Sequence, residues 1–196
     1  MIFIRPLRLL ALFLLLVVIG VPLAAVVLLI LAVTGSPGSC VPDGRAIAIS
    51  PELATSFQTK WDQLDATLDA GQVSTIVLDD SEVTSRARLW IDEHDLPASD
   101  VYICFEEQRG SASGKIDVPF FPGDVDVLIH GTLDLTGDHP TIEIDDIEAG
   151  GLPGPVTDLM EGFVTGIVDD ESKDLALDHD YGIAFGDGQA TISGQP

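Results

Sequence analysis

The sequence predicts an α+β fold, in which an N-terminal transmembrane helix is followed by a curved antiparallel sheet packed against amphipathic helices. Three observations predict it. Residues 9–33 contain no charged side chain, residues 51–70 repeat apolar side chains at helical spacing, and much of the chain after residue 100 alternates apolar and polar residues. Because helical and strand periods occupy separate stretches, we expect the helices to pack on one face of the sheet.

Residues 9–33 are predicted to be an uncleaved membrane anchor. As a helix these 25 residues would be about 37 Å long, against about 30 Å for the hydrocarbon core of a bilayer. A cleaved signal peptide is the alternative, but its apolar region is usually about 7 to 15 residues long. Arg5 and Arg8 precede the run, so the positive-inside rule places residues 1–8 in the cytoplasm. We therefore expect a single-pass protein of the cell membrane with its C-terminal domain extracytoplasmic.

The charge of the chain lies almost entirely after the apolar run. Only two of the 9 Lys and Arg residues precede residue 34, whereas all 32 Asp and Glu residues follow it, which gives residues 35–196 a net charge of −25. Nucleic-acid phosphates and anionic membrane surfaces repel such a module, so we expect no nucleic-acid partner. Residues 34–45 are rich in Gly, Pro and Ser and predict a linker, and residues 46–196 have the length of one domain.

The two cysteines, Cys40 and Cys104, both follow the predicted anchor. In an oxidising compartment they can pair, which would close a loop of about 65 residues and stabilise the fold by about 4 kcal/mol in the loop-entropy treatment. Lipidation of Cys40 is the rival interpretation. It fits less well, because the residue three positions before it is Pro37 rather than an aliphatic residue. We therefore expect a disulfide.

Two helices are predicted after the linker. Ser50 followed by Pro51 is a typical helix start, a side-chain cap and a proline at the first helical position. Apolar residues then recur at steps of three and four, at Leu53, Phe57, Trp61, Leu64 and Leu68. The second helix opens with the capping-box spacing of Asp79 and Glu82 and ends before Pro97.

Seven strands are predicted from alternation and short apolar runs. They cover residues 74–78, 101–106, 115–120, 123–136, 141–148, 181–185 and 190–193. We expect residues 110–114 to form the turn between the second and third strands. In the longest strand we expect a bend at Gly131 and an outward-facing side chain at Leu128. The pair Asp145 and Asp146 shifts the alternation by one residue, as a β-bulge would.

Residue patterns for catalysis or metal binding are weak. The histidines, which lack zinc-site spacing, are His94, His130, His139 and His179. A possible nucleophile elbow at residues 110–114 has Ala112 where the serine must be, and a calcium loop starting at Asp178 has Gln189 at its bidentate position. We expect no catalytic residue, no metal and no cofactor. A hydrolase that uses paired carboxylates stays as a third hypothesis.

The segment Gly150-Gly151-Leu152-Pro153-Gly154-Pro155 precedes a third helix whose apolar side includes Leu159 and Phe163. Together with Asp80-Ser81-Glu82-Val83 at the opening of the second helix and the order of elements over residues 75–194, it resembles small membrane-anchored bacterial proteins of the YpmS-like and LmeA-like groups. These proteins are related to tubular lipid-binding (TULIP) domains. The resemblance implies a curved sheet that wraps a long helix, with an apolar groove that accepts lipid acyl chains.

We therefore expect an anchored binding protein that holds a lipid or another apolar ligand between the first and third helices and the sheet. The residues expected to line this groove are Phe57, Trp61, Leu64, Val127, Ile129, Leu133, Leu159 and Phe163. Apolar stripes at structural spacing also fill ordinary cores, so the same side chains fit a groove or a dry interior. The alternative is a structural cell-envelope module that presents an acidic face to a protein partner.

Overall fold

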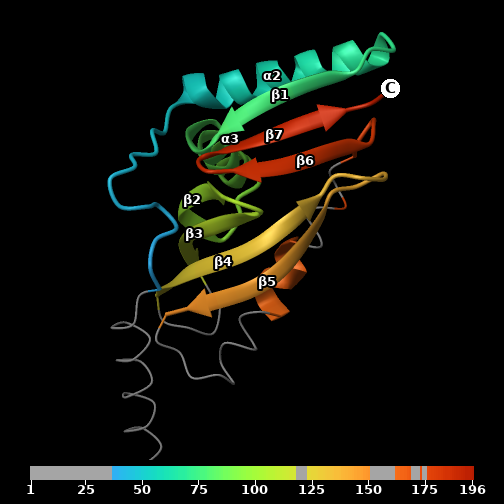
Figure 1. Ribbon diagram of the computed structural model, residues 1–196. Helices are drawn as coiled ribbons and strands as arrows, with labels where there is room; N and C mark the ends of the chain where they lie inside the picture. Colours follow the sequence, from blue (N-terminus) through green and yellow to red (C-terminus); the bar gives the residue numbers. More distant parts are fainter. Residues whose placement is uncertain (1–36, 118–122, 151–161, 169–172, 174–175) are drawn as a thin grey trace, which may run out of the picture.

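A computed structural model describes residues 37–117, 123–150, 162–168, 173 and 176–196 (Figure 1). The predicted anchor and the glycine- and proline-rich segment at residues 151–155 lie outside these residues. Among the helices of the described part, none is long and apolar enough to cross a membrane. The described chain is α+β, with two antiparallel sheets and three helical segments, which confirms the predicted fold class for this part.

The first sheet has three strands and packs under the longest helix. It contains β1 (Ser74–Asp79), β7 (Gln189–Gly194) and β6 (Tyr181–Gly186), in that order. The helix α2 (Pro51–Asp69) lies along this sheet (Figure 1). It starts as predicted, because the side chain of Ser50 accepts a hydrogen bond from the backbone N–H of Leu53 at 3.3 Å.

The second sheet has four strands, β2 (Ala98–Glu106), β3 (Arg109–Asp117), β4 (Asp124–Asp134) and β5 (Thr141–Ala149), joined in sequence order. The helical residues 162–168 pack on one of its faces, and Val164 is 3% exposed there. The predicted bulge is confirmed, because His130 pairs with Asp146 while Gly131 pairs with Ile144. Beside the bulge, any side chain on Gly131 would place its Cβ 2.5 Å from the carbonyl oxygen of Glu143, so only glycine fits.

The helix α3 (Asp80–Glu93) starts with the predicted capping box between Asp79 and Glu82. Its side chains also pair with the outer edge of β2. Thr84 Oγ1 accepts a hydrogen bond from the N–H of Ile103 and donates one to the carbonyl oxygen of the same residue, at 2.9 and 3.1 Å. The residues one helical turn before and after Thr84 make similar hydrogen bonds. Asp80 accepts one from the N–H of Phe105 at 2.8 Å, and Arg88 donates one to the carbonyl oxygen of Val101 at 2.6 Å.

The three contacts between α3 and β2 line up because the repeat distance of the helix nearly equals that of the strand. Four residues along a helix advance about 6 Å, and two residues along a strand advance about 6.6 Å. Positions 80, 84 and 88 of α3 therefore meet positions 105, 103 and 101 of β2 in turn. Helix side chains thus satisfy the backbone of this sheet edge and cover it, which protects it from pairing with another chain.

Two predictions about the second sheet are wrong. Residues 110–114 are not a turn, because Gly110 pairs with Phe105 inside β3 and the turn lies at residues 107–108, where Gln108 has a φ of 77°. Of the residues that suggested a loop, Gly114 is required by close packing, because a Cβ there would lie 3.0 Å from the side chain of Val101 and 3.1 Å from the carbonyl oxygen of Ser99. Leu128 does not face solvent; it is 8% exposed, because residues 40–47 cover that face of the sheet.

Candidate functional site

The residues predicted to line one groove divide between two apolar clusters. Leu64, with Phe57, Trp61 and Leu133 packed around it, belongs to the cluster under α2, which we call the α2 cluster. Val127, Ile129 and Phe163 belong to a second cluster beneath the helical residues 162–168, which we call the β4 cluster. Leu159 lies outside the described residues. Binding of a ligand by these side chains therefore stays a prediction.

The α2 cluster is centred on side chains with almost no exposed surface. Its buried members are Leu64, Leu68, Leu78, Leu135, Tyr181 and Ile192. Leu64 is 0% exposed, and the ring of Trp61 lies 5.3 Å from that of Tyr181 and 6.1 Å from that of Phe57. Such distances are those of packed aromatic pairs. The predicted groove residues on α2 therefore pack directly on the first sheet.

Tyr181 connects this cluster to a polar network on α2. Its hydroxyl donates a hydrogen bond to Asp65 at 2.5 Å, and the neighbouring His179 contacts Asp69 at 3.1 Å. Burial, and then the hydrogen bond to Asp65, raise the pKa of Tyr181 above its ordinary value. Two carboxylates one helical turn apart thus fix the start of β6 against α2. The sequence shows Asp65 and Asp69 only as polar positions of a helix, so this network could not be predicted from it.

The β4 cluster is built from smaller side chains. Its buried members are Ile116, Val125, Val127, Ile147, Ala149 and Val164. Phe163 and Ile129 are only partly buried against it. Along the same face of β4, Leu133 reaches the α2 cluster, and Gly131 lies between Ile129 and Leu133 without a side chain. The row of apolar side chains on β4 is therefore interrupted where the two clusters adjoin.

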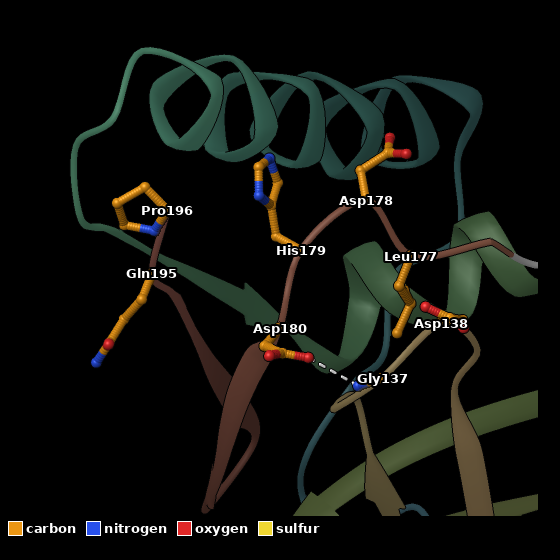
Figure 2. A pocket seen from close by; sticks show the side chains of 8 residues that line it. All are labelled: Gly137, Asp138, Leu177, Asp178, His179, Asp180, Gln195 and Pro196. Atoms are coloured by element: carbon orange, nitrogen blue, oxygen red, sulfur yellow. Dashed lines mark hydrogen bonds between the residues drawn. The ribbon is translucent and has the colours of Figure 1, made fainter.

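The part of the chain that the structure describes has shallow hollows, of which two bear on function. The larger, of about 260 Å³, is lined by Gly137, Asp138, Leu177, Asp178, His179, Asp180, Gln195 and Pro196 (Figure 2). The carboxylate of Asp180 accepts a hydrogen bond from the N–H of Gly137 at 2.8 Å, whereas Asp178 points toward α2 (Figure 2). The carboxylates of Asp178 and Asp180 therefore point in different directions and do not form the converging pair that the hydrolase hypothesis requires.

A short segment of chain crosses the other face of the second sheet, and we call residues 37–41 the strap. The structure joins Cys40 to Cys104 in a disulfide, as predicted. Cys104 is 0% exposed and Cys40 8%, and the N–H of Cys40 donates to Ser113 Oγ at 3.2 Å. The smaller hollow, of about 150 Å³, lies beside the strap and has Lys115 in its lining. Part of the predicted linker is thus fixed to the domain.

A row of polar side chains crosses the same face of the sheet. Ser111 Oγ lies 2.8 Å from Nδ1 of His130, and His130 pairs with Asp146 on the next strand. The order serine, histidine, aspartate resembles a nucleophilic triad, but Ser111 is 3% exposed and neither described hollow reaches it. The contact therefore links β3 to β4. This contact could not be predicted from the sequence, because it depends on the register of three strands.

Charged groups of the described chain are distributed unevenly. Six basic residues are engaged within the molecule, namely Arg45, Lys60, Arg86, Arg88, Arg109 and Lys115. One of these contacts is the ion pair between Lys60 and the buried side chain of Glu82. Burial by itself would raise its pKa, but hydrogen bonds from Lys60, Ser56 and the Asp79 N–H outweigh burial, and the pKa lies below its ordinary value.

On β5, in contrast, four exposed carboxylates form no ion pair with any described residue. They are Glu143, Asp145, Asp146 and Glu148, and we call them the β5 carboxylates. Glu143, Asp146 and Glu148 stand opposite Thr132, His130 and Leu128 in the register with β4, so they share one face of the sheet. Asp145 is the extra residue of the bulge.

Comparisons with protein families, with curated proteins and with solved structures find no match to this chain. The resemblance to lipid-binding TULIP domains therefore stays a prediction.

Proposed function

We propose that this protein is a membrane-anchored extracytoplasmic module that binds a basic protein partner through the β5 carboxylates. The apolar run of residues 9–33, with Arg5 and Arg8 before it, supports the anchor and the orientation. The observation that carries the binding proposal is the set of exposed carboxylates on β5 that have no basic partner among the described residues.

Two features support a surface role over a ligand held inside. The predicted groove residues with the least exposure, Leu64 at 0% and Val127 at 4%, have the exposure of ordinary core side chains. The larger described hollow is lined mainly by polar groups, whereas sites for apolar ligands are mostly apolar. A cationic segment, in contrast, would find several carboxylates at strand spacing without having to displace an internal ion pair.

The attraction is expected to be electrostatic and short-ranged. Like charges repel along β5, so a basic segment that docks there relieves this repulsion as well as forming new pairs. At physiological ionic strength the Debye length is about 8 Å, so only charges close to β5 contribute strongly. Binding should therefore weaken with salt and depend on where on the domain the carboxylates lie, beyond the total charge of the domain.

The test uses the full chain in phosphatidylcholine nanodiscs and a fluorescent oligolysine peptide as the probe. The variant Glu143→Gln/Asp146→Asn/Glu148→Gln should bind the peptide roughly tenfold more weakly by anisotropy, because three local charges are lost. The matched control Asp62→Asn/Asp92→Asn/Glu107→Gln removes three exposed carboxylates elsewhere and should change the affinity by about twofold or less. Equal losses in the two variants would show that only net charge matters and would contradict the proposal.

A further inference from the structure

We infer that the strap orients the domain on the membrane: the end of the second sheet where β3 finishes and β4 starts faces the bilayer, and α2 faces away. The inference rests on the proposed anchor. It adds a second partner, a lipid surface, and it determines how the β5 carboxylates are presented.

The tether, which is the chain between the predicted span and the strap, is short. The predicted span ends at residue 33 and the strap begins at Pro37, so only four peptide steps separate them, a reach of about 14 Å when fully extended. Seven steps separate residue 33 from Cys40, a reach of about 25 Å. For comparison, α2 with its 19 residues is about 28 Å long. A tether shorter than the domain restricts which side can approach the bilayer.

The strap cannot swing away from the sheet. Cys40 is bonded to Cys104 in β2, and its N–H is held by Ser113 in β3. The strap begins beside the end of β3 and the start of β4, since Pro37 and Gly38 line the same hollow as Lys115 and Asp126. Figure 1 shows the strap starting next to the beginning of β4 and α2 on the opposite side of the molecule. The tether therefore acts on one defined end of the domain.

The surface at the end of β3 and the start of β4 carries charges of both signs. Lys115 Nζ pairs with Asp100 at 2.9 Å, and the exposed carboxylates of Asp117 and Asp124 stand opposite each other in register. The hydrogen bond that Lys115 donates to Asp100 raises the pKa of Lys115 most, and the charges of Asp126 and Asp124 add to it. This mixed but mainly acidic surface fits a zwitterionic lipid surface, whose amine or choline groups attract carboxylates, better than an anionic one.

The orientation also places the β5 carboxylates. Glu148 pairs with Leu128 near the start of β4, whereas Glu143 pairs with Thr132 farther along. The row therefore rises from the membrane-proximal end toward α2. A basic partner would bind on the side of the domain, along a line that leads away from the bilayer.

The experiment measures energy transfer from a dye on the domain to a headgroup-labelled lipid in phosphatidylcholine vesicles that hold the full chain. The dye is attached to a single new cysteine at one of two exposed positions, by Asp124→Cys or by Gln72→Cys, which follows α2. The native cysteines are buried and bonded, so they do not take the label. Transfer should be at least about twofold more efficient from position 124, because transfer falls steeply with distance and position 72 lies at the end of α2, on the side of the domain away from the start of β4 (Figure 1). Equal transfer, or stronger transfer from position 72, would overturn the inference.

Two control variants test whether the strap is the cause. Insertion of about 20 Gly and Ser residues between residues 36 and 37 adds a flexible tether of about 25 Å root-mean-square length and should abolish the difference between the two positions. Cys40→Ser/Cys104→Ser should reduce the difference, and the insertion remains decisive if this variant does not fold. A difference that survives the insertion unchanged would overturn the inference. Loss of the chain from the vesicles in alkaline carbonate would instead contradict the anchor of the proposed function.

Discussion

The two halves of the domain are stabilised in different ways. In the half under α2, large side chains on one amphipathic helix pack on the first sheet, and burial of apolar surface dominates. In the half that carries the strap, the buried side chains of the β4 cluster are small or β-branched, and a disulfide and polar contacts hold the covering chain over Leu128. The first half is therefore a conventional core, whereas the second is a sheet whose outer face is covered by a covalently attached segment.

The largest effect is expected from breaking the disulfide. Cys40→Ser/Cys104→Ser frees a loop with a sequence separation of 64 and should lower the free energy of unfolding by about 4 kcal/mol. Denaturant unfolding of the variant and of the native chain under non-reducing conditions measures it. If the strap half owed its stability to packing alone, the midpoint would barely move and the comparison would fail.

A slightly smaller loss is expected in the α2 half from Leu64→Ala. Leu64 is 0% exposed, so truncation leaves a cavity and should lower the free energy of unfolding by about 3 kcal/mol. The matched control is Leu89→Ala on α3, where the side chain is 43% exposed and the change should stay below about 0.5 kcal/mol. Chemical denaturation of both variants compares them directly. Similar losses for the two leucines would contradict the assignment of Leu64 to a packed core.

Thr84→Val tests the ladder between α3 and β2. Valine keeps the shape of threonine but leaves the N–H and carbonyl of Ile103 without their partner, which should cost about 2 kcal/mol. Thr55→Val on the exposed side of α2 removes a hydroxyl that bonds only to the Pro51 carbonyl and serves as the control, with an expected change below about 0.5 kcal/mol. Thermal melts give both values. A loss for Thr84→Val no larger than that for Thr55→Val would contradict the role of Thr84 in holding α3 on β2.

The smallest of these effects is expected from Tyr181→Phe, at about 1 kcal/mol near neutral pH. The pKa of Tyr181 is raised in the folded state, so its stabilising contribution is complete below the unfolded-state pKa of 10.0 and is lost as the pH rises above it. The free energy of unfolding of the native chain should therefore fall between about pH 9 and about pH 11, and that of the variant should fall less. Parallel curves for the two proteins across this range would rule out Asp65 as the partner of an un-ionised Tyr181.

Local signals in the sequence predicted the parts of this fold that depend on near neighbours. The cap at Ser50, the capping box of Asp79 and Glu82, and the bulge beside Asp146 each involve residues a few positions apart, and all are confirmed. The disulfide could be predicted because two cysteines allow one intramolecular pairing.

What could not be predicted depends on how distant strands meet. Alternation along β4 showed that one face is apolar, but not that this face serves two clusters separated at Gly131. The serines of β3 suggested a turn, because the strap that packs on them lies about 70 residues away in sequence. The groove residues were predicted to form one site although they divide between two clusters. Periodicity shows which residues of an element share a face, but it does not show which elements share a core.

Native mass spectrometry of the full chain, released from phosphatidylcholine nanodiscs, tests the central claim most directly. That claim is that the α2 cluster and the β4 cluster are filled cores and that the protein acts through its surface. The main species should have the mass of the polypeptide with one disulfide and no bound lipid. A lipid that stays bound stoichiometrically after the nanodisc is stripped, and that is lost in Phe163→Ala, would contradict the claim and restore the groove.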